Sequence, residues 1–270
     1  MSAPTGNAVQ TRRLHPSPMS TTVNYCGHAT LMIQVDGVNI LTDPVLGDRV
    51  LHLRRRNMSG RAWLEGLPEP DLILLSHLHT DHLHLPTLRR LSRTIPMVVP
   101  RGTAPWLRRV VPQTLFELSP GEQSVFSGLT ITATLAAHIT NLAPALLNLV
   151  QGYLIQGSTT IYFPGDTDIF PQMRDIGDVG LDVALMPVWG WGPNLGPGHL
   201  NPLRAAQALS LLRPRFAIPI HWAAFRPLGG MWEKMPYLHQ PGPEFQRLAA
   251  NFSPETAVHV LAPGASFTLP

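Results

Sequence analysis

Apolar residues of the chain fall into short runs that predict β-strands rather than long helices. Most of these runs are four to seven residues long and end in Gly, Asp, Pro or Asn, as strands usually do. The predicted strands cover residues 22–25, 30–35, 38–42, 71–76, 130–135, 159–163, 181–187 and 216–220. Asp36 and Gly37 separate the second run from the third, and an Asp-Gly pair favours the tight turn of a β-hairpin.

Four further segments have the pattern of amphipathic helices. They cover residues 86–93, 103–110, 201–214 and 243–252. In the third of them, Asn201 is a suitable N-cap and Pro202 occupies the first helical position. In each half of the chain, a run of strands comes before an alternation of strands and helices. This order predicts a mixed fold of the α/β (α+β) class, in which two sheets pack face to face with helices outside them.

Composition sets the limits of the domain. Residues 1–20 are polar and rich in Ser, Thr and Pro, and we expect them to form a disordered leader. No change of composition interrupts residues 21–270, for which we expect a single domain. Cys26 is the only cysteine, so an intramolecular disulfide is excluded. No stretch approaches the roughly 18 uninterrupted apolar residues of a membrane span, and we expect a cytoplasmic protein.

The charge of the chain is weakly positive, with a formal net charge of +3 and a pI of about 9.5. This balance favours an anionic small molecule as partner, and it does not indicate nucleic-acid binding. A basic run comprises Arg54, Arg55, Arg56 and Arg61. Two interpretations of this run stay open, a solvated loop or a rim that attracts a phosphate or carboxylate group.

Seven side chains that could bind a metal lie just beyond the ends of predicted strands. Four of them belong to the segment HLHTDH, which directly follows the strand 71–76. The seven are His77, His79, Asp81, His82, His138, Asp166 and His221. Strand ends that meet at one edge of a sheet are where α/β proteins usually build their sites. Because crowding so many imidazoles without a partner costs free energy, the pattern predicts a metal site.

The spacing within HLHTDH suits two ions rather than one. Zinc prefers imidazole nitrogen and carboxylate oxygen, at about 2.0–2.2 Å. His77 and His79 are separated by one residue, so on an extended segment they point the same way and can hold one ion. Asp81 and His82 come after the chain turns and can face a second ion. Seven donors exceed the needs of one tetrahedral ion, although a histidine such as His138, taken singly, is more often an ordinary core or surface residue.

These residues resemble the signature of the metallo-β-lactamase superfamily, which is HxHxDH followed by a distant His, Asp and His. Further segments are similar to the branch that contains N-acyl phosphatidylethanolamine phospholipase D and ascorbate-phosphate lactonase. These segments are GHATLMI (27–33), LTDPV (41–45), FPGDTD (163–168), GPGHLNP (196–202) and IPIHW (218–222). The resemblance covers nearly the whole chain from about residue 22, and it implies a four-layer αββα sandwich.

The resemblance also implies two Zn²⁺ ions per chain, with Mn²⁺ or Fe²⁺ able to replace either. The ligands that it implies are His77, His79 and His138 for the first ion, Asp81, His82 and His221 for the second, and Asp166 as a bridge. With Asp166 and no cysteine, the second site resembles the hydrolase branches rather than the antibiotic-degrading enzymes. His79 stands where flavo-diiron proteins carry Glu, which disfavours a redox iron site. His84 stands where the branch often has Asp, and we expect it behind the ligands or at the surface.

Several other residues are candidates for supporting roles. The resemblance implies that Asp43 orients a metal-binding histidine from behind, and the alternative is a turn-initiating Asp before Pro44. His28 either supports the site in a similar way or is a simple loop histidine. His199 lies in the glycine- and proline-rich loop 190–202. It could protonate a leaving oxygen or hold a phosphoryl oxygen, and the alternative is a role in loop packing.

Two apolar features near these residues also have open interpretations. Trp189 and Trp191 could form a wall of the cleft that contacts the substrate, or they could be core anchors. The apolar segment 141–155 contains a predicted strand at 150–155. Its first part could be a lid over the site, although core packing is the better explanation.

Together these observations predict a dinuclear zinc hydrolase in which a water between the ions becomes a hydroxide nucleophile. Asp81, through the second ion, and His199, by assisting the leaving group, are the predicted catalytic residues. We prefer phosphodiester cleavage, because two adjacent dications suit displacement at phosphorus, and lactone or other carboxylic ester hydrolysis is the alternative. A metal-stabilised binding protein without activity is a further alternative. We expect an anionic small-molecule ester as substrate and no nucleic-acid partner. The oligomeric state stays open, and a homo-oligomer is one interpretation.

Overall fold

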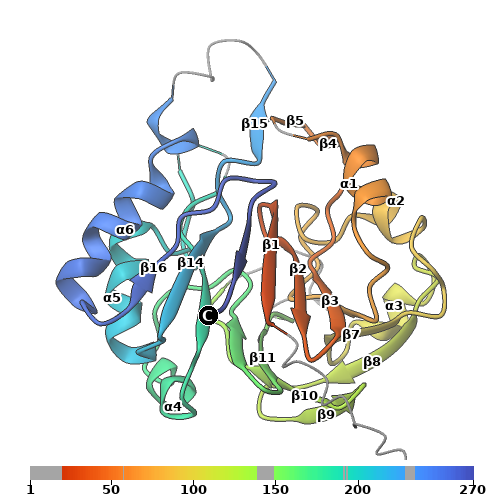
Figure 1. Cartoon of the computed structure of the whole chain (residues 1–270). Coiled ribbons are helices and arrows are strands. Elements are labelled where there is room, and N and C mark those ends of the chain that lie inside the picture. The colour runs from red at the N-terminus through yellow and green to blue at the C-terminus, as the bar shows by residue number, and fades with distance from the viewer. Residues whose placement is uncertain (1–19, 57, 139–148, 191, 193, 229–234) are drawn as a thin grey trace, which may run out of the picture.

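The computed structural model describes residues 20–56, 58–138, 149–190, 192, 194–228 and 235–270. Two seven-stranded sheets pack face to face at its centre (Figure 1). The first has the strand order β17 (Ser266–Thr268), β1 (Thr22–Gly27), β2 (Thr30–Val35), β3 (Val38–Thr42), β6 (Leu72–Leu74), β7 (Pro96–Pro100) and β8 (Thr114–Leu118). The second has the order β16 (Ala257–Val258), β14 (Phe216–Ile220), β13 (Val183–Pro187), β12 (Thr160–Phe163), β11 (Gly152–Gln156), β10 (Leu129–Thr134) and β9 (Gln123–Phe126).

Helices cover the outer face of each sheet, so the predicted four-layer αββα sandwich is confirmed (Figure 1). The helices beside the first sheet are α1 (Gly60–Gly66), α2 (Leu85–Leu88) and α3 (Ala104–Leu107). Those beside the second sheet are α4 (Met173–Asp178), α5 (Pro202–Leu212) and α6 (Pro241–Phe252), with a 3₁₀ turn, η3 (Pro236–Leu238), before α6. A small third sheet joins β15 (Phe225–Pro227), β5 (Leu53–Arg55) and β4 (Arg49–Val50). Across the described residues, no helix combines the length and apolar character needed to cross a membrane.

The central strands bury both of their faces, which explains why their apolar runs are nearly continuous. In β2, Leu31 and Ile33 lie between the sheets and belong to one core cluster with Ile131 of β10. Met32 points to the opposite face and belongs to a second cluster, together with Trp63 of α1. A strand buried in this way needs apolar residues at successive positions, because its side chains alternate between two apolar layers.

The topology places several strand ends at a single edge. Each half begins with antiparallel strands and continues with parallel ones: β6, β7 and β8 run parallel to β3, whereas β13, β14 and β16 run parallel to β12. Asp36 and Gly37 form the expected hairpin turn between β2 and β3, with φ of 50° and 82°. Because parallel strands share a direction, β3 and β6 end at one edge of their sheet, and β12 and β14 end at one edge of theirs.

Candidate metal centre

The histidine-rich loop follows β6 directly and turns back on itself within six residues. The backbone N–H of His82 donates to the carbonyl of His79 at 3.0 Å and closes the turn. The other predicted ligands follow strands of the second sheet: His138 comes after β10, Asp166 after β12 and His221 after β14. The structure brings all seven predicted residues together in two adjacent groups.

The first group offers three nitrogens and one oxygen. Its members are His77, His79, His138 and Asp166, whose donor atoms lie within 4.8 Å of one another. Nε2 of His77 and Nε2 of His138 lie 3.0 and 3.2 Å from Nδ1 of His79. Nε2 of His77 is 4.0 Å from Oδ2 of Asp166. These are the donor types of a zinc site.

The second group contains Asp81, His82 and His221 and, in addition, His28. Nε2 of His82 and Nε2 of His221 are 3.2 Å apart, and each is 3.9 Å from Oδ2 of Asp81. The sequence left the role of His28 open, between a support of the metal site and a simple loop histidine. Its Nε2 lies 2.9 Å from Oδ2 of Asp81, and its ring packs on that of His221 with the centroids 3.7 Å apart. His28 has a φ of 60°, and its carbonyl accepts the backbone N–H of His221 at 2.8 Å.

Four histidines of the two groups are held from behind through Nδ1, which leaves Nε2 free on the other side. Nδ1 of His138 lies 2.8 Å from the carbonyl of Gly198, and Nδ1 of His221 lies 2.5 Å from the carbonyl of Trp189. A carbonyl can only accept, so each Nδ1 carries a proton and donates it. The neutral ring then presents a bare Nε2 to the site, which is the form that binds a metal.

Asp43 holds the other two of these histidines. Its Oδ2 accepts Nδ1–H of His82 at 2.7 Å and the hydroxyl of Ser76 at 2.6 Å, and its Oδ1 accepts the backbone N–H of Ser76 at 2.7 Å. Having donated to Asp43, the Ser76 hydroxyl accepts Nδ1–H of His77 at 2.9 Å. The buried Asp43 therefore orients one histidine of each group, and Ser76 is a participant that the sequence did not single out.

Asp166 lies between the two groups and provides the test of whether a cation fits. Its Oδ2 is 3.2 Å from Nε2 of His82, and its Oδ1 is 3.1 Å from Nε2 of His221. Oδ1 is buried and has no hydrogen-bond partner among the described residues. Since His221 has its proton on Nδ1, two lone-pair donors face each other at this point. A cation shared between them would satisfy both, so the donor set fits a bound metal.

The electrostatics of the cluster point the same way. Burial lowers the pKa of His77, of His79 and of His138, and it lowers the pKa of His221 to about 3, so these rings are neutral. Burial opposes the charge of the two carboxylates, yet the imidazoles around them hold the pKa of both well below the usual range. His82, which lies beside both carboxylates, contributes to this lowering in each case.

His82 is the exception among the histidines. Burial alone would lower its pKa, but Asp166, Asp81 and Asp43 outweigh burial and raise the pKa well above its usual value. The buried carboxylates thus hold a proton on His82. A divalent cation bound at the same place would balance the negative charge of these carboxylates instead of that proton.

Comparison with known proteins identifies the family. Residues 38–222 match the family described as beta-lactamase superfamily domain, which spans more than half of the chain and contains all the metal-site residues above except His28. The chain belongs to the beta-lactamase superfamily. The match includes the two strand ends that carry Asp43 and His221 and the whole of HLHTDH.

Relatives of this superfamily member include proteins of known and unknown activity. The chain is 32% identical over 229 residues to the N-acyl-phosphatidylethanolamine-hydrolyzing phospholipase D 1 of Caenorhabditis elegans, and the match covers 76% of this chain. The match spans 64% of that protein, slightly less than two thirds. The chain is also 29% identical over 261 residues to a UPF0173 metal-dependent hydrolase of Nitratidesulfovibrio vulgaris. That match covers 93% of this chain and 96% of that protein. The solved structure of the metallo hydrolase Igni18 from Ignicoccus hospitalis shares the fold, with a TM-score of 0.73, 23% identity and coverage of 93% and 99% of the two chains.

The metal site of this beta-lactamase superfamily protein opens into a pocket of about 370 Å³. Thr80, Asp81, Asp166 and His199 are among the residues that line it. Nε2 of His199 lies 3.4 Å from Oδ2 of Asp166, and its side chain is 20% exposed. Burial lowers the pKa of His199, but the hydrogen bond to Asp166 outweighs burial and raises it. His199 is therefore placed to reach a molecule in the pocket.

Trp189 has a different position from that expected of a cleft wall. The Trp189 indole donates to the carbonyl of Gly192 at 3.0 Å, and its ring borders a separate pocket of about 340 Å³ beside Tyr237. Only the carbonyl of Trp189 contacts the site, through His221. This geometry favours the packing role that the sequence left open. Trp191 and residues 139–148 lie outside the described residues, whereas the predicted strand at 150–155 corresponds to β11.

The arginine run does not form a rim around this pocket. Arg55 is buried: its guanidinium donates to the carbonyls of Cys26, Val45 and Gly47 and lies over the ring of Phe225. Burial lowers the pKa of Arg55 to about 10. No arginine is among the described residues that line the metal pocket. Arg55 therefore supports the third sheet and the turn before His28, and the run gives no argument for an anionic substrate.

His84 lies outside both donor groups. Its Nδ1 is 2.7 Å from the hydroxyl of Thr87 in α2, and its ring packs against Gly47 so closely that an added Cβ there would come within 2.4 Å of it. Burial lowers the pKa of His84. Its role is to fix the start of α2 against the neighbouring loop.

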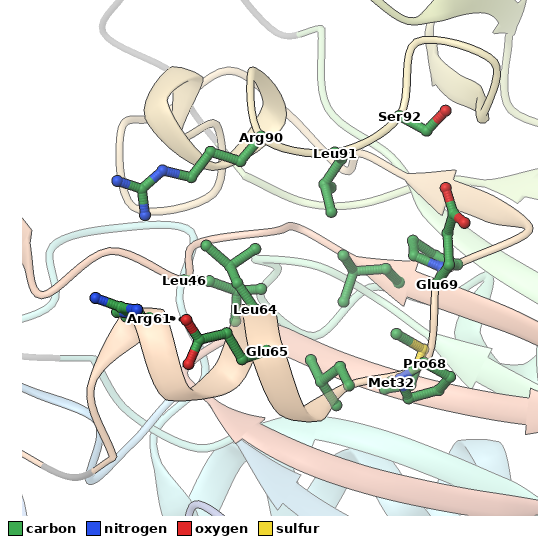
Figure 2. Close-up of a pocket in the computed structure, with 13 residues that line it drawn as sticks. Met32, Leu46, Arg61, Leu64, Glu65, Pro68, Glu69, Arg90, Leu91 and Ser92 are labelled. Atoms are coloured by element: carbon green, nitrogen blue, oxygen red, sulfur yellow. Dashed lines mark hydrogen bonds and ion pairs between the residues drawn. The ribbon is translucent and has the colours of Figure 1, made fainter.

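A larger pocket, of about 510 Å³, lies between α1 and the segment that follows α2 (Figure 2). Leu46, Leu64 and Leu91 line its interior, and Arg61 forms an ion pair with Glu65 at 2.7 Å at its edge (Figure 2). None of the eight metal-site residues lines it. Its size alone gives no reason to prefer it to the smaller metal pocket as the functional site.

Proposed function

We propose that this protein is a metal-dependent hydrolase with two Zn²⁺ ions, and that it cleaves phosphodiester bonds. The single observation that carries the proposal is the position of Asp166 between the imidazoles of two donor groups, which together contain six imidazoles, that of His28 included, and two carboxylates. Two relatives named as hydrolases, one of them a phospholipase D, support the reaction type. His77, His79 and His138 would hold one ion, Asp81, His82 and His221 the other, and Asp166 would contact both.

Two such ions supply a lowered water pKa and charge stabilisation at a developing oxyanion. The protein's own residues then set the geometry. Asp43 and Ser76 fix the rings of His77 and His82, so their Nε2 atoms cannot rotate away from the site. His199 lines the open pocket beside Asp166, and in this proposal it would give a proton to the leaving oxygen.

Hydrolysis of a lactone or another carboxylic ester is the second candidate, and one observation favours it. No arginine is among the described residues lining the metal pocket, so an anionic phosphate would meet no guanidinium group there and would rely on the ions and on groups such as His199 and Asn194. A purely structural metal site is less well supported, because a pocket of about 370 Å³ opens beside the ligands.

A substrate panel tests the proposal. Zinc-loaded and manganese-loaded protein would be assayed with p-nitrophenyl phosphodiesters, phosphomonoesters, phosphotriesters, lactones and thioesters. We expect the largest kcat/KM with a phosphodiester, loss of turnover with a chelator, and recovery when zinc returns. A larger kcat/KM with lactones would favour the second candidate, and no turnover of any ester by metal-loaded protein would contradict both.

His28→Asn is expected to weaken zinc binding at the second site by about 10–100-fold. Asparagine tolerates the left-handed backbone at this position, so the turn is kept while the contact with Asp81 is lost. Competition with a fluorescent zinc chelator measures the affinity. His259→Asn is the matched control, because the ring of His259 stacks on Phe267, away from the metal site. Equal zinc affinities for wild type and His28→Asn would show that His28 does not support the site.

The predictions of a cytoplasmic protein and of a homo-oligomer stay predictions, as does the assignment of residues 21–270 to one hydrolase domain.

A further inference from the structure

A pocket of about 460 Å³ adjoins the metal pocket and differs from it in character. The two pockets share Leu78 and Thr80, which alternate with the histidines and Asp81 in the loop after β6. Leu78 is buried and belongs to the core cluster under the outer helices. The neighbouring pocket is therefore adjacent to the metal pocket, and Leu78 and Thr80 lie at the boundary between the two.

The neighbouring pocket is lined mainly by apolar side chains from separate segments. Leu83 and Leu85 come from the chain leading into α2, Trp106 comes from α3, and Leu51 comes from the turn between β4 and β5. Leu83 is buried, whereas Leu51 is 75% exposed and Trp106 is 37% exposed. Large exposed apolar side chains gathered around an apolar floor are typical of a binding surface.

Leu51 is the most informative of these residues. It lies in the two-residue turn between Val50 and Leu53, with a φ of 49°. Such turns favour asparagine or glycine, and a branched side chain such as leucine is strained in this region. A leucine that is both strained and exposed adds little to the stability of the fold. Its presence is better explained by what its side chain contacts when a ligand is bound.

We propose that this pocket, formed by Leu51, Leu78, Leu83, Leu85 and Trp106 and called the apolar trough below, binds an apolar substituent of the ester substrate. The inference rests on the proposed hydrolase function and narrows its substrate class. The ester group would lie in the metal pocket, and an alkyl or aryl arm would cross Leu78 into the apolar trough. The two pockets share Leu78 and Thr80 as lining residues, and this adjacency favours the substrate itself, rather than a separate ligand, as the occupant.

A chain-length series tests this inference. Zinc-loaded protein would be assayed with the methyl, butyl and octyl diesters of p-nitrophenyl phosphate. Each methylene that leaves water favours binding, so kcat/KM should rise by about tenfold from methyl to butyl. Leu51→Asn should bring the butyl-to-methyl ratio close to one without lowering Tm, because asparagine suits the turn. Leu203→Asn, a change at an exposed leucine of α5, is the matched control and should keep the wild-type ratio.

A binding measurement separates this inference from the proposed function. Calorimetry with methylphosphonate and butylphosphonate needs no turnover, and wild type should bind the butyl compound about tenfold more tightly. Wild type could fail to cleave any diester and still bind butylphosphonate more tightly than methylphosphonate. If Leu51→Asn then loses this difference in affinity, the hydrolase proposal fails and the inference about the apolar trough is supported. Equal ratios in wild type and Leu51→Asn, or no butyl preference in either assay, would overturn the inference. It would also be overturned if Leu51→Asn left the ratios unchanged and reduced only co-sedimentation with phosphatidylcholine vesicles, since Leu51 would then contact a membrane surface.

Discussion

Replacing Asp81 by alanine is expected to lower kcat/KM by about a thousandfold or more, while the protein stays folded. Asp81 is a member of the second donor group and not of the first, so its loss removes a ligand from the second group and leaves all four members of the first in place. Losing the charge stabilisation of one ion costs several kcal/mol, and each ~1.4 kcal/mol is tenfold in rate. Steady-state kinetics on the best substrate of the panel, with elemental analysis of the same samples, measures both effects.

Asp175→Ala is the matched control for this change. Asp175 is an exposed carboxylate in the first turn of α4 and is not a member of either donor group. Its removal should leave both kcat/KM and zinc content at wild-type values. Unchanged turnover in Asp81→Ala would contradict the role proposed for the second ion.

Replacing Asp43 by alanine is expected to destabilise the protein by about 3 kcal/mol or more and to weaken zinc binding at both positions. Three buried donors would lose their acceptor: the backbone N–H and the hydroxyl of Ser76, and Nδ1–H of His82. Each buried group left without a partner costs about 1–3 kcal/mol. Urea unfolding of the chelated protein measures the structural effect without any contribution from bound metal.

The zinc affinity of Asp43→Ala is the second measurement. It reports on the orientation of the histidines, whereas urea unfolding reports on the stability of the protein. Asp48→Ala is the matched control, because Asp48 is exposed and its side chain accepts a hydrogen bond from Gly60 N–H at 2.6 Å. We expect a loss of less than about 1 kcal/mol for Asp48→Ala and no change in its zinc affinity. Wild-type stability together with wild-type zinc affinity in Asp43→Ala would show that Asp43 does not orient the histidines.

The central strands and the metal-site loop were predictable because local sequence determines them. The run 30–35 predicts β2 at its observed bounds, since both faces of this strand are apolar, and Asp36-Gly37 predicts the turn that follows it. The segment HLHTDH is visible because its histidines are close in the sequence. By contrast, β7 was not predicted, because prolines at both of its ends obscure the strand pattern.

Contacts between distant segments could not be predicted in the same way. The role of Arg55 depends on the carbonyls of Cys26 and Val45, so its place in a basic run suggested a solvated or anion-binding position that the structure does not show. The contact of His28 with Asp81 depends on the turn after β1 reaching the end of β14. One signal was available, because Gly27 before His28 suggests a backbone that turns sharply at a strand end.

Counting the metal ions per chain is the most direct test of the central claim that Asp166 joins two cation sites. Purified protein would be loaded with zinc, passed through a desalting column and analysed by inductively coupled plasma mass spectrometry against the protein concentration. Wild type should retain about two zinc ions per chain and Asp81→Ala about one, because each donor group satisfies one tetrahedral ion. About one ion per chain or fewer in saturated wild type would contradict the claim.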